Sequence, residues 1–152
     1  MGSEMCIRDS YYPTKLFDES VSQQEGLITR QDTPSFEPET PAQWVVSGPH
    51  FFVGTPFNRS ARTNCVHNNA YDGVDLTDLA EDYLPRSVYR PGNDKGNTAT
   101  LNEKIPRWPA EEPISSSYRY VNREMIGSTS ERTLISSVIP PGAVHILSLI
   151  HI

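Results

Sequence analysis

Short runs of β-branched and aromatic residues, separated by turn residues, dominate the hydrophobic pattern of this chain. They lie near residues 43–46, 50–54, 118–126 and 132–139, and a Gly-Ser-Thr-Ser segment separates the last two. Apolar residues that alternate with polar ones between such turns are typical of β-strands. We therefore predict antiparallel strands at these four places, the last two paired as a β-hairpin.

Helical patterns are rare by comparison. Asp78 with Glu81 three positions later has the spacing of a capping box, and a proline ends any helix there within about two turns. This pattern predicts one short helix at residues 78–84. A helix capped by Ser128 is the alternative to the final hairpin, but the β-branched residues of 133–139 disfavour it.

The remaining segments lack a clear period. Residues 18–43 are rich in Pro, Glu, Gln, Ser and Thr, which predicts either a linker or an ordered loop on a larger domain. Residues 57–64 have the composition of a polar loop, residues 71–76 that of a short strand, and residues 91–113 that of a proline-rich connector. Much of the chain is therefore expected to be irregular.

The pattern predicts a fold between α+β and mainly β, with an incomplete antiparallel sheet, one short helix and long irregular loops. The expected core consists of Trp44, Phe51, Val53, Leu76, Leu79, Tyr120, Leu134, Ile135 and Val138. This core is small for a stable domain, so we expect the chain to be a fragment of a larger protein. A chain that does not fold by itself is the alternative.

The two ends of the chain are related to each other at the level of codons. When residues 5–10 (MCIRDS) are back-translated, the complementary strand read in a shifted frame encodes residues 147–152 (LSLIHI). The pair resembles translated adapters of sequencing libraries, so we expect residues 1–10 and 147–152 to be adapter-derived tails. Residues 11–42 are then expected to be linker-like and open to disorder, and residues 43–146 to be a partial domain.

Charge is distributed unevenly along the chain, whose net charge is −6. Residues 11–40 hold two cations and six anions, a balance of −4, whereas residues 51–146 hold ten cations and eleven anions. Eight of those ten cations are arginines, whose planar fork suits phosphates, base edges and structural ion pairs alike. The net acidity argues against a free-standing, nonspecific nucleic-acid binder. No apolar stretch is long enough to span a bilayer, so no membrane partner is expected.

Cysteine and histidine usage indicates neither a disulfide nor a metal site. Outside the expected tails Cys65 stands alone, which fits a cytoplasmic protein in a reducing environment. Cys65 and His67 lack the further ligands that a zinc site needs. We interpret His50 and His145 as half-buried or surface residues rather than as ligands.

Signatures of catalysis are also missing from the sequence. It has no Gly-rich phosphate loop, no nucleophile elbow and no paired-histidine metalloprotease helix. The segment FVGTP at residues 52–56 is superficially similar to the cofactor loop of methyltransferases, but it lacks the second glycine. We therefore expect no catalytic residue and no cofactor site within this chain.

Six blocks of the sequence nevertheless resemble a known class of protein. They are residues 48–59 (GPHFFVGTPFNR), 71–77 (YDGVDLT), 82–86 (DYLPR), 118–125 (YRYVNREM), 131–135 (ERTLI) and 139–142 (IPPG). Between about residues 40 and 146 the chain resembles the C-terminal specificity (target-recognition) region of bacterial type II restriction-modification N6-adenine DNA methyltransferases. The C-terminal blocks are the most specific part of this resemblance.

The resemblance implies a role in the recognition of a DNA sequence. In that family the methyltransferase domain, with its S-adenosylmethionine loop and Asn-Pro-Pro-Tyr motif, lies upstream of such blocks, and the downstream region reads the DNA. It therefore implies double-stranded DNA as the partner of the parent protein, and a missing upstream methyltransferase domain. It also implies S-adenosylmethionine as a cofactor of the parent protein and not of this fragment.

Residue types suited to DNA contact occur in two clusters, because arginine forks to guanine and asparagine pairs with adenine. The expected DNA-contacting residues are Asn58, Arg59, Arg62 and Asn64 in the first cluster, and Arg119, Arg123 and Arg132 in the second. The alternatives are a polar structural connection for the first cluster and structural ion pairs for the second.

Tyr118 and Tyr120 are expected in the core, with stacking on an extruded base as the alternative. A different function also fits the sequence. Its acidity and its aromatic strands suggest, as the runner-up, a small β-rich binding or interaction module with no nucleic-acid role.

Overall fold

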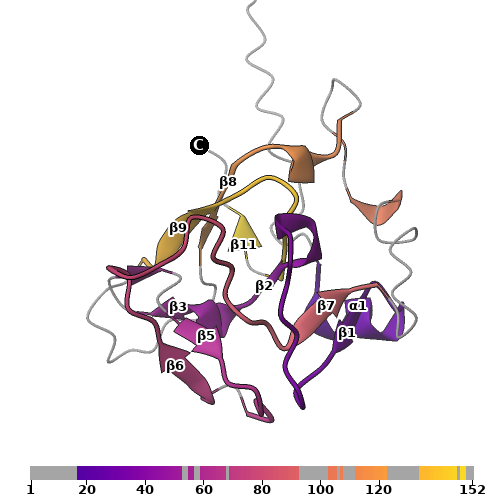
Figure 1. Cartoon of the computed structure of the whole chain (residues 1–152). Coiled ribbons are helices and arrows are strands. Elements are labelled where there is room, and N and C mark those ends of the chain that lie inside the picture. Colours follow the sequence, from indigo (N-terminus) through magenta and orange to yellow (C-terminus); the bar gives the residue numbers. More distant parts are fainter. Residues whose placement is uncertain are drawn as a thin grey trace, which may run out of the picture.

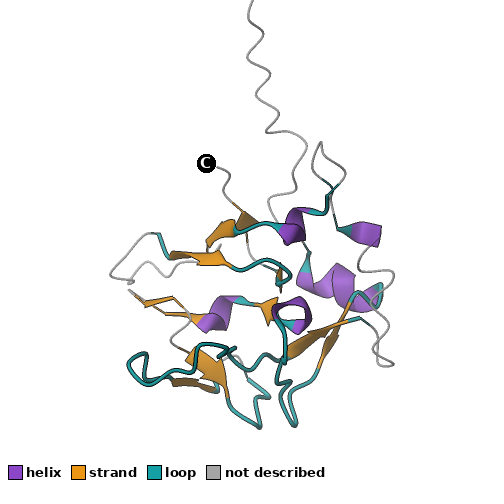
Figure 2. Cartoon of the chain, turned by 45° about the horizontal axis from the view of Figure 1, so that its top comes forward, coloured by secondary structure: helices purple, strands orange, loops and turns teal. Residues whose placement is uncertain are grey.

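The computed structural model describes residues 17–52, 55–56, 59–67, 69–92, 103–105, 107, 112–122, 134–146 and 148–149, and they form short strands, short helices and long connecting segments (Figure 1, Figure 2). In chain order the elements are α1 (Glu19–Gln24), β1 (Ile28–Arg30), η2 (Pro41–Gln43), β2 (Val45–Val46), η3 (Gly48–His50), β3 (Phe51–Phe52), β4 (Thr55–Pro56), β5 (Arg59–Ala61), β6 (Tyr71–Gly73), β7 (Tyr89–Pro91), η4 (Ile114–Ser116), β8 (Arg119–Asn122), β9 (Ser136–Ile139), β10 (Val144–His145) and β11 (Ser148–Leu149). The predicted fold class, between α+β and mainly β with incomplete sheets, is confirmed.

The strands form several small sheets instead of a single one. β8 lies between β11 and β9 in a three-stranded antiparallel sheet, whereas β1 pairs with β7, β3 with β4 and β5 with β6 as antiparallel pairs. β2 and β10 run parallel, with Val45 opposite Val144. A strand is present at each of the four predicted places, but these strands belong to three different sheets, because β2 pairs with β10, β3 with β4, and β8 with β9 and β11. The pairing of β2 is parallel, which corrects its prediction as an antiparallel strand.

The pairing of β8 with β9 agrees with the predicted hairpin. Tyr120 lies opposite Val138 in an antiparallel register. Because β9 is extended, a helix that starts at Ser128 and continues through this segment is excluded. Residues 123–133, which connect the two strands, lie outside the described residues.

The helix predicted at residues 78–84 is wrong, since this segment consists of turns and irregular backbone. The Asp75 carboxylate accepts hydrogen bonds from the Thr77 amide, at 2.9 Å, and from the Thr77 hydroxyl, at 2.6 Å. Such local bonds compete with helix formation. In addition, Leu76 and Leu79 are 45% and 37% exposed, so a helix here has no buried apolar face to stabilise it.

The α-helix lies instead in the segment interpreted as linker-like. α1 is capped by Asp18, whose carboxylate accepts hydrogen bonds from two amides of the first turn, at 3.0 and 3.2 Å. The apolar side chains around it, Phe17, Leu27 and Ile28, are buried in the core. Residues 17–42 thus contain a helix, a strand and buried side chains. The local composition conceals this order because β7 supplies the packing partners.

The core consists of two clusters of buried side chains. The larger cluster contains Phe17, Leu27, Ile28, Val45, Ala61, Cys65, Tyr71, Val88, Tyr89, Ile105, Ile114 and Val144, and the smaller contains Trp44, Val46, Val121, Ile135, Ile139 and Ala143. Val45 and Val46 belong to different clusters, so β2 lies between the two. The Ser87 hydroxyl donates to the Val45 carbonyl at 2.8 Å and ties β2 to the segment before β7.

The predicted core is only partly correct. Of its members, Trp44 and Ile135 are buried, Tyr120 is half-buried, Leu76, Leu79, Leu134 and Val138 are exposed, and the side chains of Phe51 and Val53 lie outside those described. Val138 of β9 was expected on the buried face, but successive residues of a strand point to opposite faces. Ile139 points inward and is fully buried, whereas Val138 points outward and is 56% exposed. Tyr118, at 74% exposed, also lies outside the core.

Two histidines expected to be half-buried or on the surface are fully buried. The Nε2–H of His50 donates to the Arg86 carbonyl at 2.9 Å, and its Nδ1 accepts from the Ser47 amide at 3.1 Å, which is the pattern of a neutral ring. Burial lowers the pKa of His50 to about 4. Burial, together with the nearby Arg119, lowers the pKa of His145 to about 3. Both rings are therefore neutral parts of the core at pH 7.

β11 falls within residues 147–152, which were expected to be an adapter-derived tail. It extends the β8 sheet, with Ser148 opposite Asn122. Residues 1–16 lie outside the described residues. The adapter origin of both ends stays a prediction.

Gly142 is expected to be the glycine most sensitive to substitution. Its φ is +90°, its amide donates to the Ser115 carbonyl at 2.6 Å, and an added Cβ lies 3.1 Å from the backbone nitrogen of Ala42. Since side-chain-bearing residues rarely adopt this conformation, we expect Gly142→Ala to lower the free energy of unfolding by about 1–3 kcal/mol. Urea denaturation measures the change. Gly73→Ala is the control, because an added Cβ there meets nothing within 4 Å; equal losses in both variants contradict this account.

Candidate nucleic-acid interface

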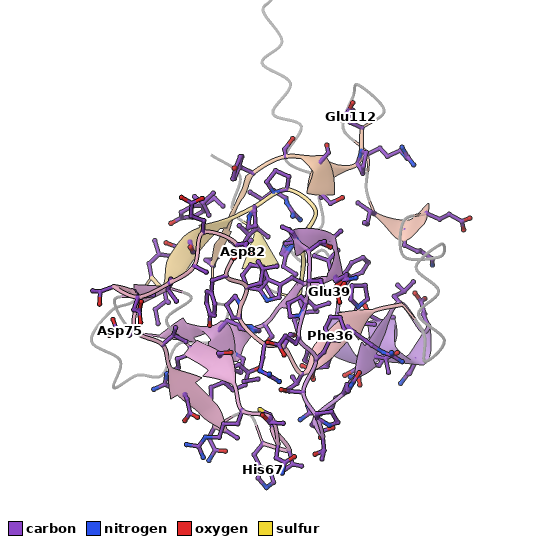
Figure 3. The ribbon with its side chains drawn as sticks, viewed as in Figure 1. Phe36, Glu39, His67, Asp75, Asp82 and Glu112 are labelled. Carbon is purple, nitrogen blue, oxygen red and sulfur yellow. The ribbon has the colours of Figure 1, made fainter. Side chains whose placement is uncertain are left out.

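The segment 57–64, expected to be a polar loop, is only partly a loop: residues 59–61 form β5, and residues 62–64 begin the loop of the β5–β6 hairpin. This hairpin lies at one end of the molecule, where His67 is labelled in Figure 3. Residues 62–70 connect β5 to β6, and at the base of this hairpin Ala61 lies opposite Tyr71. Both of these side chains are buried, so the hairpin is anchored in the core while most of the loop is exposed. An exposed loop on a fixed base is a suitable arrangement for binding.

Hydrogen bonds around Cys65 hold the loop closed. The Arg62 amide donates to the Ala70 carbonyl at 3.0 Å, and the Ala70 amide donates to the His67 carbonyl at 2.9 Å. The Cys65 thiol is fully buried and donates to the Ala70 carbonyl at 3.2 Å. Burial raises the pKa of this thiol, which keeps it protonated as a hydrogen-bond donor. Cys65 therefore supports the loop from inside.

The chain segment after β1 supports the same loop from the side. The Cys65 amide donates to the Asp32 carbonyl at 2.7 Å, and the Ser35 amide donates to the Thr63 carbonyl, also at 2.7 Å. The sequence did not indicate these supporting residues, because they lie in the segment interpreted as linker-like. The only local signal is the short β-branched run of β1 that precedes them.

The structure places three of the four residues of the first cluster on this hairpin. Arg59 lies in β5 and is half-buried, whereas Arg62 and Asn64 lie on the loop and are exposed. Asn58 lies outside the described residues. The hairpin therefore brings together one asparagine and two arginines of the predicted set.

The Arg62 side chain forms an exposed ion pair with Asp72 of β6. The Nε and Nη2 of Arg62 lie 2.8 and 2.7 Å from one oxygen of this carboxylate, and the hydrogen bond from Arg62 lowers the pKa of Asp72. Both side chains are more than half exposed. Exposed ion pairs of this kind contribute little to stability, so the guanidinium is able to exchange the carboxylate for another anion.

The described residue of the second cluster, Arg119, differs from those of the first in its burial. Arg119 is buried, and its guanidinium donates to the carbonyls of Ser117, at 3.3 Å, and Ala143. Burial lowers its pKa to about 10, so the group remains charged at pH 7. A side chain enclosed in this way has a structural role, which corrects its prediction as a DNA contact. Arg123 and Arg132 lie outside the described residues.

Basic and acidic side chains are interspersed on the described surface. Ion pairs between described residues include Arg30 with Asp32 at 3.4 Å, Arg62 with Asp72 at 2.7 Å, Arg86 with Glu37 at 2.6 Å, and Lys104 with Glu25 at 3.6 Å. Such pairing weakens the long-range field that attracts DNA. Any attraction to phosphates here is therefore local.

Comparison with known proteins gives no relatives. No family model, no curated protein and no solved structure matches the chain. In the part of the chain that the structure describes, no three His, Cys, Asp or Glu side chains gather as metal ligands would, and no helix is both long and apolar enough to cross a membrane.

Proposed function

We propose that this chain is the DNA-recognition part of a site-specific adenine DNA methyltransferase of a bacterial restriction-modification system, acting in the cytoplasm. The resemblance of the six sequence blocks supports this proposal, and parts of several blocks meet in space. Val121, Ile135 and Ile139, which come from three different blocks, lie together in the smaller core cluster, and Leu84 of a fourth block packs against it.

The observation that carries the DNA-binding role is the exposure of Arg62 and Asn64 on a loop with a buried base. The Arg62 guanidinium suits a phosphate or the edge of guanine, and the Asn64 amide suits adenine. The hydrogen bonds around Cys65 fix the backbone that presents both side chains. A preorganised loop loses less conformational entropy on binding than a mobile one.

This proposal assigns no catalytic step to the chain itself. Methyl transfer from S-adenosylmethionine to the amino group of adenine belongs to the upstream domain of the parent protein. The part played by this chain is to hold double-stranded DNA in register through phosphate contacts and base-edge contacts.

We expect the double variant Arg62→Ala/Asn64→Ala to weaken DNA binding about tenfold, because two contacts are lost. Fluorescence anisotropy with a short DNA duplex of random sequence measures the affinity of the full chain over a series of salt concentrations. If Arg62 contacts a phosphate, the slope of log K against log salt falls by about 1 in the variant. Asp72→Asn is expected to strengthen binding about twofold, since it removes a negative charge beside Arg62.

Absence of binding by the folded chain at low salt overturns the proposal, as does unchanged binding by the double variant. Near-ultraviolet circular dichroism from Trp44 and Trp108 verifies that each sample is folded. Sequencing of the flanking gene is an independent test. If an upstream Asn-Pro-Pro-Tyr or Asn-Pro-Pro-Phe motif is missing from the same reading frame, the methyltransferase assignment fails.

The second candidate is a β-rich interaction module without a nucleic-acid role. The observation in its favour is the pairing of Arg30, Arg62, Arg86 and Lys104 with carboxylates, together with the net charge of −6. The salt series separates the two candidates, because the module predicts no salt-dependent affinity for DNA.

A further inference from the structure

Arg30, at the end of β1, connects the core to the loop that carries Arg62. Its Nη2 donates to the Val66 carbonyl of that loop at 3.4 Å, and its Nη1 donates to the Tyr89 hydroxyl at 3.2 Å. Its Nε faces the Asp32 carboxylate at 3.4 Å. The planar fork of one guanidinium therefore reaches three groups on three segments of the chain.

The inner end of this connection is fixed by the core. The guanidinium carbon of Arg30 lies 5.8 Å from the centre of the Tyr89 ring, within the range of a cation–π interaction. The Tyr89 ring is buried, and its hydroxyl donates to the carboxylate of Glu19 in α1. Burial and the neighbouring Glu19 raise the pKa of Tyr89, so the hydroxyl keeps its proton. Arg30 thus extends from a group that α1 and β7 hold in place.

The outer end of the connection reaches the exposed part of the loop. Cys65 is buried and bonded from inside, but the next residue, Val66, is 54% exposed. The Arg30 contact therefore acts beyond the buried base, next to the segment that presents Arg62 and Asn64. Loss of this contact leaves the base of the loop intact and removes a support of its outer part.

We propose that Arg30 is a positioning residue, which holds the 62–70 loop in the geometry that lets Arg62 and Asn64 reach DNA. This inference rests on the proposed DNA-recognition function. Arg30 acts through the loop and makes no phosphate contact of its own. Its effect on binding therefore depends on the two loop side chains.

We expect Arg30→Ala to weaken binding of the random-sequence duplex about fivefold in the full chain, with an unchanged salt slope. Arg30→Lys is expected to recover little of the affinity, because an ammonium group does not reproduce the fork that spans Tyr89, Asp32 and Val66. Lys104→Ala is the matched control. It also removes one positive charge from an ion pair, here with Glu25, and it is expected to leave the affinity unchanged.

A double-mutant cycle tests whether Arg30 acts through the loop. In the Arg62→Ala/Asn64→Ala background, the Arg30→Ala change is expected to have no further effect on affinity. Additive losses overturn the positioning role, and so does a salt slope that falls by about 1 in Arg30→Ala, because both indicate a direct phosphate contact.

The same measurements separate this inference from the proposed function. If the loop double variant weakens binding and Arg30→Ala does not, only the positioning role fails. If the loop double variant binds like the parent chain, the proposed function fails. Should Arg30→Ala not fold, the cycle is run with Arg30→Lys, for which a folded sample with unchanged affinity overturns the positioning role.

Discussion

Acidification from pH 7 to about pH 4 is expected to unfold the protein. His50 and His145 become charged in the unfolded state, whereas their burial in the folded core disfavours the charged form. The folded-state pKa values of about 4 and about 3 lie below the ordinary value of 6.5, so the unfolded state binds more protons. The stability that depends on the neutral rings is present above pH 6.5 and is lost as the pH falls from 6.5 towards 4. By pH 4 each histidine costs on the order of 3 kcal/mol, and the sum is comparable to the total stability of a small domain.

Urea denaturation at a series of pH values, followed by circular dichroism, measures this effect. We expect His145→Leu to be folded at pH 7 and to show a weaker pH dependence, since neither ring nitrogen of His145 has a hydrogen-bond partner among the described residues. His50→Leu is expected to lose stability already at pH 7. It removes the donor to the Arg86 carbonyl and the acceptor for the Ser47 amide.

His67→Ala is the control for these histidine variants. His67 is exposed on the 62–70 loop, so we expect this variant to follow the pH profile of the parent chain. A free energy of unfolding that stays constant between pH 7 and pH 4.5 contradicts the burial of His50 and His145.

Ile139→Ala is expected to lower the free energy of unfolding by about 2–5 kcal/mol, the range for a large aliphatic side chain removed from a core. Ile139 is fully buried in the smaller core cluster, at the end of β9. The adjacent Val138 is 56% exposed, so we expect Val138→Ala to change stability by no more than about 0.5 kcal/mol.

These two neighbours make a matched pair, because they lie on the same strand and differ in the face to which they point. Chemical denaturation at pH 7 measures both variants against the parent chain. Similar losses in the two variants, or a larger loss for Val138→Ala, contradict the register in which Val138 lies opposite Tyr120.

The strands were predictable from local residue types, whereas the choice of buried face was not. β8 and β9 alternate in a recognisable way, and the structure contains both. Both faces of this pair carry apolar side chains, however, with Tyr120 and Val138 on one and Val121 and Ile139 on the other. Burial of the second face depends on contacts with Trp44 and Val46 from a distant part of the sequence, which local patterning does not reveal.

The capping residues Asp18 and Asp78 also show that local sequence alone does not decide the structure. Asp78 and Asp18 are both suitable capping residues, but a helix forms only after Asp18. The apolar residues beside α1, such as Phe17 and Leu27, pack in the core, while Leu76 and Leu79 remain exposed. Tertiary packing, rather than the cap, therefore decides where a short helix forms.

For the candidate site, residue chemistry predicts a DNA-contacting role for exposed residues of the 62–70 loop, but it does not predict which residues support that loop. Arg62 and Asn64 are exposed as a DNA-contacting role requires, whereas Arg119 is enclosed by carbonyl groups. An arginine in a strand gives no sign in the sequence of which face it occupies. The sequence gives no sign of a role for Arg30, because its segment has the composition of a linker.

The parallel pairing of β2 with β10 has a consequence for how the chain acquires its structure. Val45 and Val144 are neighbours in space, although 98 residues of the sequence lie between them. Closing so long a loop is entropically costly and slow, and on a ribosome it has to wait until residues 144–145 have emerged. Until then the two valines of β2 lack a strand partner, and a chaperone or protease that recognises exposed apolar strands has time to act on the nascent chain.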